Sequence, residues 1–264
     1  MTPAESIFYL QAAGHMLRAR TIIPVGKSLQ GAPVLVFLHE GLGCIEMWRD
    51  FPEMLVKATN LPALIYDRYG SGGSDPLQGA RSGNPFIWEA EIALPDILTA
   101  CGIEKPILIG HSDGGSIALH YAARYPESPV GVIAEAAHVF GEELTLNSIR
   151  KAVSAFEAGD LRKKLARYHG DQTDTMFHGW ADIWLLPENL SWSMEAALYR
   201  ITCPVLIVQG EQDEYGTLAQ VEAIVRGVSG RTEKLIIPDC AHSPHLQVRE
   251  TTLNGMVQFV ESLL

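Results

Sequence analysis

Basic residues are scarce in this chain. Its 264 residues include 20 Lys and Arg against 31 Asp and Glu, which gives a formal net charge of −11 at pH 7. Nucleic acids and anionic membranes are bound through concentrated basic patches, and the sequence contains no such patch. We therefore expect neither a nucleic acid nor a membrane as the partner, and favour a small molecule.

Disulfide, metal and membrane signatures are also missing. The four cysteines, Cys44, Cys101, Cys203 and Cys240, are scattered without metal-ligand spacing, which predicts free thiols and a reducing compartment. No basic residue precedes the short apolar segment at the N-terminus, and no run approaches the roughly 20 apolar residues of a membrane span. These absences predict a cytoplasmic protein.

The residues that are present indicate a globular α/β protein. Hydrophobic residues make up 47% and charged residues 19% of the chain, enough for one large domain, or one domain with an insertion. Near-continuous apolar runs predict strands that are covered on both faces, as in a parallel sheet. These runs are 33–38, 63–66, 106–109, 130–134, 204–209 and 234–237.

Helical segments alternate with these runs. They are expected at 47–58, 86–101, 116–124, 218–228 and 251–264. Strands that alternate with helices predict a doubly wound, mostly parallel sheet with right-handed crossovers. Residues 6–9 and 15–23, separated by Gly14, predict an antiparallel hairpin at its edge.

Residues 139–200 show helix-like patterns and no convincing buried strand. A stretch of that length is too long for an ordinary connection and predicts a helical insertion. Its tryptophans, Trp180, Trp184 and Trp192, with Met176 and Phe177, either face a pocket or only pack the insertion onto the main domain. The sequence leaves both readings open.

The stretch "ILIGHSDGG" contains Gly110, Ser112 and Gly114 between a predicted strand and a predicted helix. A Gly-x-Ser-x-Gly pattern in that context is typical of a nucleophile elbow, in which a serine occupies a strained turn. The alternative is that Ser112 or Asp113 only caps the helix. A helix start can also stabilise an oxyanion, so the two readings can coexist.

A nucleophilic serine needs a base and an orienting carboxylate. Asp213 follows the predicted strand at 204–209, and His242 follows the strand at 234–237. Active sites of open α/β sheets collect at the carboxyl ends of strands, so all three candidates are expected together. The rival acids are Glu211 and Glu214, with Glu135 at the end of "VGVIAE" as a further alternative; a metal pair of His242 and His245 is disfavoured by Pro244.

The elbow "GHSDGG", the loop "HEGLG" at 39–43, the turn "DRYGSGGSD" at 67–75, "GEQD" and "AHSPH" together resemble an α/β-hydrolase over essentially the full length. The order Ser112, Asp213, His242 is that family's order. The resemblance implies a catalytic triad on a sheet of about eight strands. It also implies that 1–138 and 201–264 form the core, and that 139–200 form a cap inserted after the sixth strand.

The same resemblance implies an oxyanion hole made by the backbone N–H groups of Gly41 and Asp113. Here Glu40 stands where the family commonly has glycine after His39. Glu40 either places a carboxylate near the pocket or, as we prefer, points away and holds the loop. A charge beside a developing oxyanion would oppose it. His39, Glu40, His138, Trp180 and Trp184 are the candidate pocket-lining residues.

The predicted function is hydrolysis of a small carboxylic ester through an acyl-enzyme, without cofactor or metal. The stretches "GLGCIE" and "GSGGSD" do not fit a dinucleotide site. A serine at position 112 separates the chain from relatives with an aspartate nucleophile. The tryptophan-rich insertion favours a substrate with an apolar or aromatic part. The alternatives are a carbon–carbon bond hydrolase of aromatic ring-cleavage products and a ligand receptor that retains the triad.

Overall fold

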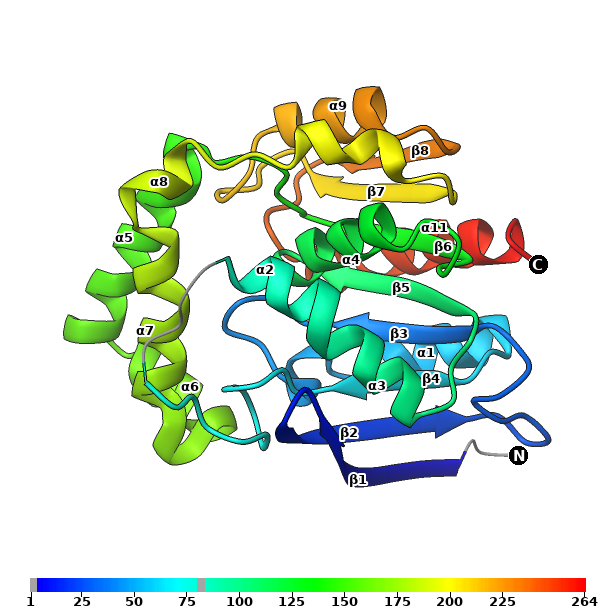
Figure 1. The fold of residues 1–264 in the computed structure, drawn as a ribbon. Coiled ribbons are helices and arrows are strands. Elements are labelled where there is room, and N and C mark those ends of the chain that lie inside the picture. The colour runs from blue at the N-terminus through cyan, green and yellow to red at the C-terminus, as the bar shows by residue number, and fades with distance from the viewer. Residues whose placement is uncertain (1–3, 80–83) are drawn as a thin grey trace.

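The computed structural model describes residues 4–79 and 84–264, which form an eight-stranded sheet with helices on both faces (Figure 1). The strand order is β1-β2-β4-β3-β5-β6-β7-β8; β2 pairs antiparallel with both β1 and β4, and every other pairing is parallel. The strands are β1 (Ala4–Ala12), β2 (His15–Ile23), β3 (Val34–Leu38), β4 (Ala63–Tyr66), β5 (Pro106–His111), β6 (Gly131–Glu135), β7 (Val205–Gly210) and β8 (Thr232–Ile237). The doubly wound, mostly parallel sheet expected from the sequence is confirmed.

The helices connect these strands and cover the sheet. The α-helices are α1 (Phe51–Thr59), α2 (Pro85–Trp88), α3 (Leu94–Ala100), α4 (Asp113–Arg124), α5 (Glu143–Ala158), α6 (Leu161–His169), α7 (Thr173–Trp184), α8 (Pro187–Leu190), α9 (Leu218–Gly227), α10 (Pro244–Gln247) and α11 (Arg249–Glu261). Short 3-10 turns are η1 (Ile45–Trp48), η3 (Gly170–Gln172) and η4 (Glu195–Arg200), and η2 (Glu89–Ala93) is a π-helical turn. The single helix expected at 86–101 is therefore interrupted by η2.

Successive side chains of the central strands enter two separate apolar cores. Val36 of β3 faces a core shared with α3, α4 and α9, whereas its neighbour Phe37 faces a core shared with α1 and α11. Every residue of β3 to β7 is buried. This double coverage explains why these strands read as continuous apolar runs.

The two outermost strands differ from the central ones. β1 and β2 form the hairpin, and its two turn residues, Ala13 and Gly14, have φ angles of 53° and 81°, as a two-residue hairpin turn requires. The expectation that 234–237 is covered on both faces holds in part, because Leu235 and Ile236 pack half-buried against opposite cores. β8 has β7 as its neighbour on one side alone, and Lys234 is exposed and pairs with Glu222 at 3.0 Å.

Between β6 and β7 the chain forms α5 to α8 and η4. Helices α5 to α8 stand together at one end of the sheet, whereas η4 packs against α4 and α9 (Figure 1). We call residues 143–200 the helical insertion. Its only strand-like pairing within the described residues is an isolated bridge between Phe140 and Ser193 at its base. None of the helices in the described ranges is long and apolar enough to cross a membrane. All four cysteines are free thiols.

Candidate active site

Ser112 occupies a strained turn between β5 and α4. Its φ and ψ angles are 53° and −117°, a combination that non-glycine residues rarely adopt and that concentrates at functional sites. The neighbouring glycines make the turn possible, because a Cβ at Gly114 would overlap the carbonyl oxygen of Leu38 and one at Gly110 would overlap the backbone of Gly114. The Ser112 side chain makes no capping hydrogen bond to α4.

The Ser112 hydroxyl instead meets His242, which follows β8. His242 Nε2 lies 2.9 Å from Ser112 Oγ, and His242 Nδ1 lies 2.8 and 2.9 Å from the two carboxylate oxygens of Asp213. An ionised carboxylate only accepts hydrogen bonds, so Nδ1 carries the proton and Nε2 is left to accept from the serine. Ser112, His242 and Asp213 therefore form one hydrogen-bonded chain.

Asp213 is held in place by the loop after β7. Its carboxylate accepts hydrogen bonds from Tyr215 N at 2.7 Å, Gly216 N at 3.3 Å and Gln209 Nε2 at 2.7 Å. Burial alone would raise the pKa of this carboxyl group. The hydrogen bond from His242, the charge of His242 and the Tyr215 N–H together lower the pKa below its ordinary value. Asp213 is therefore an anion facing the histidine.

Glu135, the alternative acid, meets a different histidine. Its Oε1 accepts from both the backbone N–H and the Nδ1 of His245, each at 2.8 Å. Glu135, His245 and His111 are buried, and their potential ligand atoms lie within 4.8 Å of one another. These residue types can hold a metal ion, but the His245 and Glu135 groups are already hydrogen-bonded to each other. Nothing in the sequence spacing of these three residues indicated that they would meet.

The loop after β3 presents Gly41 to the site. The Glu40 carbonyl accepts hydrogen bonds from His39 Nδ1 at 2.7 Å and Arg68 Nη2 at 2.8 Å. In a planar trans peptide the N–H points opposite to the C=O, so the Gly41 N–H points away from His39 and Arg68. Gly41 lines the cavity beside Ser112.

His39 is fully buried beneath this loop and does not line the cavity. The expectation that it lines the pocket is wrong, because its Nε2 accepts the backbone N–H of Arg68 at 3.0 Å and its Nδ1 is turned to the Glu40 carbonyl. Burial and the charge of Arg68 lower the pKa of His39 to about 3. His39 is therefore a neutral ring that shapes the loop.

The side chain of Asp113 faces the helical insertion. Its Oδ1 accepts from Trp184 Nε1 at 3.2 Å, and its Oδ2 lies 3.9 Å from Arg68 Nη2. The Asp113 backbone N–H lies at the N-terminus of α4, at the positive end of the helix dipole. The Asp113 carboxylate is thus compensated by Trp184 and Arg68, while its N–H belongs to the helix start beside Ser112.

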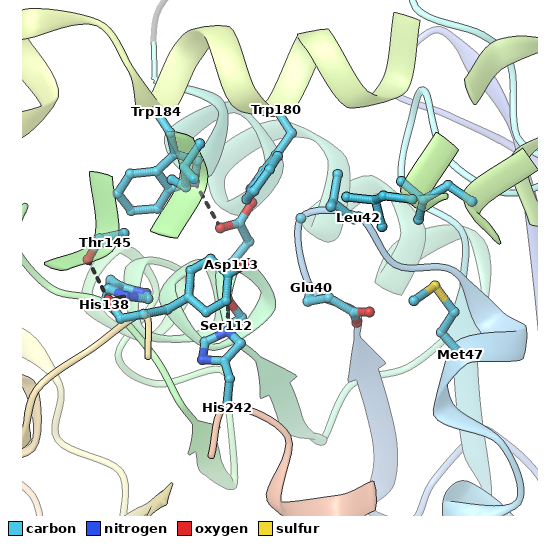
Figure 2. Close-up of a pocket in the computed structure, with 15 residues that line it drawn as sticks. Glu40, Leu42, Met47, Ser112, Asp113, His138, Thr145, Trp180, Trp184 and His242 are labelled. Carbon is cyan, nitrogen blue, oxygen red and sulfur yellow. Dashed lines mark hydrogen bonds between the residues drawn. The ribbon is translucent and has the colours of Figure 1, made fainter. Parts of the chain in front are cut away.

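Glu40 lines the cavity, and its carboxylate is directed toward Met47 rather than Ser112 (Figure 2). Each of the two expectations for Glu40 describes part of the structure: the residue lines the pocket, and its carboxylate turns away from Ser112. Glu40 Oε2 lies 3.5 Å from His111 Nδ1. Burial opposes ionisation of Glu40, but the contact with His111 and the charge of His111 lower its pKa.

The cavity above Ser112 has a volume of about 200 Å³ and is bounded by the sheet loops below and the helical insertion above. Trp180 and Trp184 line it, as expected, whereas Trp192 packs against Phe86 and Phe177 stacks on Phe156. The full lining is Glu40, Gly41, Leu42, Met47, Ser112, Asp113, His138, Thr145, Ile149, Leu161, Leu165, Trp180, Trp184, Tyr215 and His242.

This lining contains no Lys or Arg among the described residues. His138 lines it as expected; burial and the charge of His242 lower the pKa of His138, so it is neutral near pH 7. Thr145, Ile149, Leu161 and Leu165 were missed, because apolar and small residues on helices carry no sign of which cavity they face. The cavity suits an apolar ligand.

A family model described as "Alpha/beta hydrolase family" matches residues 35–252. The chain belongs to this family.

Among curated proteins, the chain is 25% identical over 259 residues to the biotin biosynthesis bifunctional protein BioHC of Cellvibrio japonicus, a match covering 88% of this chain and 48% of that protein. It is 26% identical over 174 residues to the 2-hydroxy-6-oxo-6-phenylhexa-2,4-dienoate hydrolase of Burkholderia cepacia, covering 57% of this chain and 60% of that protein. This chain thus spans about half the length of these relatives.

Among solved structures, the fold is similar to that of the 2-hydroxy-6-oxo-6-phenylhexa-2,4-dienoate hydrolase from a Rhodococcus strain. The TM-score is 0.77 at 16% identity, with 98% of this chain and 100% of that chain covered. At that identity the likeness concerns the fold alone.

Proposed function

We propose that the protein is a metal-independent serine hydrolase that cleaves a small carboxylic ester through an acyl-enzyme. The observation that supports this most is the continuous hydrogen-bonded chain from Ser112 through His242 to Asp213, built on a strained serine. A serine hydroxyl becomes a useful nucleophile when a base removes its proton, and an adjacent carboxylate orients that base. Ser112, His242 and Asp213 are the catalytic residues of this proposal.

In the first half of the reaction, Ser112 Oγ attacks the ester carbonyl carbon while His242 Nε2 accepts its proton. Asp213 stabilises the histidine cation, and the N–H groups of Gly41 and Asp113 donate to the oxyanion. Collapse of this intermediate expels the alcohol, which takes the proton from His242. Water then attacks the acyl group in the same way, with His242 as base, and releases the acid and Ser112.

The cavity also bears on the substrate. Its lining combines Trp180, Trp184 and aliphatic residues with two carboxylates, and the part of the chain that the structure describes contributes no Lys or Arg to it. A dienoate such as the one named for the Burkholderia relative carries a carboxylate, for which this lining supplies no counter-ion. We therefore favour a neutral ester with an apolar or aromatic part over a ring-cleavage product. The three buried free thiols, Cys44, Cys203 and Cys240, support a reducing compartment such as the cytoplasm.

Covalent labelling tests the proposal directly. A fluorophosphonate should label wild-type protein at Ser112 and leave Ser112→Ala unlabelled, and the same substitution should lower the turnover of small nitrophenyl esters by about a million-fold. Retention of most activity in Ser112→Ala would refute the mechanism. Labelling without turnover of any ester would favour a receptor that retains the triad.

The substrate class requires a second comparison. A neutral nitrophenyl ester should have a higher kcat/KM than a nitrophenyl ester of the same length that ends in a carboxylate, and than a dienoate ring-cleavage product. Faster cleavage of the dienoate would make the carbon–carbon hydrolase the better assignment.

A further inference from the structure

His111 lies between two hydrogen-bond acceptors beneath the proposed site. Its Nε2 is 2.8 Å from the backbone carbonyl oxygen of His242, and its Nδ1 is 3.5 Å from Glu40 Oε2. The His111 side chain is only 3% exposed. A carbonyl oxygen and an ionised carboxylate cannot donate, so each ring nitrogen satisfies its neighbour only when it carries a proton. A ring protonated on both nitrogens therefore matches both neighbours, with a hydrogen bond from Nε2 to the His242 carbonyl and an ion-pair contact from Nδ1 to Glu40.

The ionisable groups that face His111 are Glu40, Glu135, His242 and His245. The rings of His242 and His245 lie 5.2 and 4.9 Å from its ring, and Glu135 contributes a second negative charge. Burial alone would lower the pKa of His111. The contact with Glu40, the charges of Glu135 and Glu40 and the His242 carbonyl outweigh burial and raise this pKa to about 9. A cation at this position is thus compensated from two sides.

The contacts of His111 join three loops that each carry a proposed functional group. Glu40 precedes Gly41 in the loop after β3, His111 precedes Ser112 at the end of β5, and the carbonyl that His111 contacts belongs to His242 itself. β8 is three positions from β5 in the sheet. The contact therefore ties the histidine loop to the elbow across intervening strands.

We propose, on the basis of the proposed hydrolase function, that the half-buried Glu40 and the buried His111 form an ion pair that positions the machinery of the site. The charged His111 holds the backbone carbonyl of His242, so that the His242 ring stays within reach of Ser112. Glu40 keeps His111 charged and fixes the loop of Gly41. Both are positioning residues, since neither side chain contacts the Ser112 hydroxyl through a hydrogen bond in the described structure.

This role differs from a general contribution to stability. Loss of the Glu40 charge removes the counter-ion of His111, so His111 loses its Nδ1 proton at lower pH. The hydrogen bond from Nε2 to the His242 carbonyl then changes from a charge-assisted bond to a weaker neutral one. Displacement of a catalytic group by a fraction of an ångström to 1 Å lowers the rate strongly while binding changes little. The rate of reaction at Ser112 and the pH at which this rate declines on the alkaline side should therefore change together.

The test compares three proteins: wild type, Glu40→Gln, and Asp182→Asn as a matched control. Asp182 Oδ1 also lies 3.5 Å from a histidine Nδ1, that of His178, but this pair is 72% and 49% exposed and lies on the surface of α7. The measurement is the second-order rate of fluorophosphonate labelling of Ser112 as a function of pH. It reports on the nucleophile without requiring the natural substrate.

We expect Glu40→Gln to label about 10-fold or more slowly than wild type, with its alkaline limb displaced by about 1 pH unit or more toward lower pH. Asp182→Asn should match wild type in both respects. Wild-type labelling rates and an unshifted limb in folded Glu40→Gln would overturn the proposal. An absence of any labelling of wild type at Ser112 would instead refute the hydrolase function.

A measurement on wild type alone keeps the proposal testable if Glu40→Gln does not fold. Nitrogen NMR of labelled histidine, with the His111 signal identified by its absence in His111→Gln or by sequential assignment, reports whether each ring nitrogen carries a proton. Two protonated nitrogens on His111 at pH 7 support the ion pair. A neutral His111 ring at pH 7 overturns it.

Discussion

The substitution Asp213→Asn is the most severe test of the hydrogen-bonded chain. It replaces one carboxylate oxygen with an NH2 group, although both oxygens accept hydrogen bonds in the structure. Oδ1 accepts from Tyr215 N and Gly216 N, Oδ2 accepts from Gln209 Nε2, and both accept from His242 Nδ1. An amide has a single acceptor oxygen. Whichever way the amide of the variant turns, its NH2 group faces another donor, either the Tyr215 N–H or the Gln209 NH2.

The expected effect on the rate is much larger than the effect on folding. A lost buried hydrogen bond costs about 1–3 kcal/mol of unfolding free energy. The amide NH2 would also donate to His242 Nδ1, which moves the ring proton to Nε2 and leaves no lone pair to accept the Ser112 proton. The same substitution in the well-studied serine protease triad lowers kcat by about 10⁴, equivalent to about 5 kcal/mol of activation free energy.

The assay is steady-state hydrolysis of a nitrophenyl ester together with fluorophosphonate labelling. The matched control is Glu214→Gln, since Glu214 is the next residue and its side chain is exposed. The kcat of Asp213→Asn should be about 10⁴-fold lower than that of wild type, whereas Glu214→Gln should keep the wild-type kcat. A nearly silent Asp213→Asn combined with a severe Glu135→Gln would refute this reasoning and make Glu135 the acid.

Three further predictions concern the surroundings of the site. Gly114→Ala should lower the melting temperature and abolish labelling, because its Cβ would overlap a backbone carbonyl oxygen; wild-type values in both assays would contradict the elbow packing. Trp184→Phe removes the 3.2 Å hydrogen bond to the buried Asp113 carboxylate and should cost about 1.5–3 kcal/mol in urea unfolding; an unchanged unfolding free energy would show that Asp113 needs no such donor. His111 has a folded-state pKa of about 9 against an ordinary value of 6.5, so its contribution to stability is complete below pH 6.5 and is lost as the pH rises through 9. The melting temperature of wild type should fall over that pH interval, and the melting temperature of Glu40→Gln should fall less. An equally steep fall in both proteins would show that groups other than His111 cause it.

The elements that position the serine were predictable because each has a local cause. The apolar runs of β3 to β7 reflect burial on both faces, and Gly110 and Gly114 mark backbone that must pass without side chains. Asp213 and His242 could be placed together because parallel strands end at one edge. The partial exposure of β8 could not be predicted, because an edge strand with intermediate burial can carry the same apolar residues as a central one.

The surroundings of the serine were less predictable, because they depend on how distant segments pack. Leu161 and Leu165 line the cavity from α6, more than 40 residues from Ser112 in the chain. His39 has a sequence position that suggested the pocket, yet its ring is turned under the loop by contacts with Arg68 and the Glu40 carbonyl. Side-chain direction at such positions follows from tertiary partners that the local pattern does not reveal.

Two carboxylates border a site that has to stabilise negative charge, and the structure gives each its own compensation on the side away from the serine. Asp113 faces Arg68 and the Trp184 N–H, and Glu40 faces His111. Because Arg68, Trp184 and His111 are buried, water screens these contacts weakly, and neither acid places an uncompensated charge near the oxyanion. Asp113 contributes its own backbone N–H to the proposed oxyanion hole, and Glu40 immediately precedes Gly41, which contributes the other N–H. Their charges can therefore fix the direction of the donating N–H groups, which is a reason for acidic residues at this place in the chain.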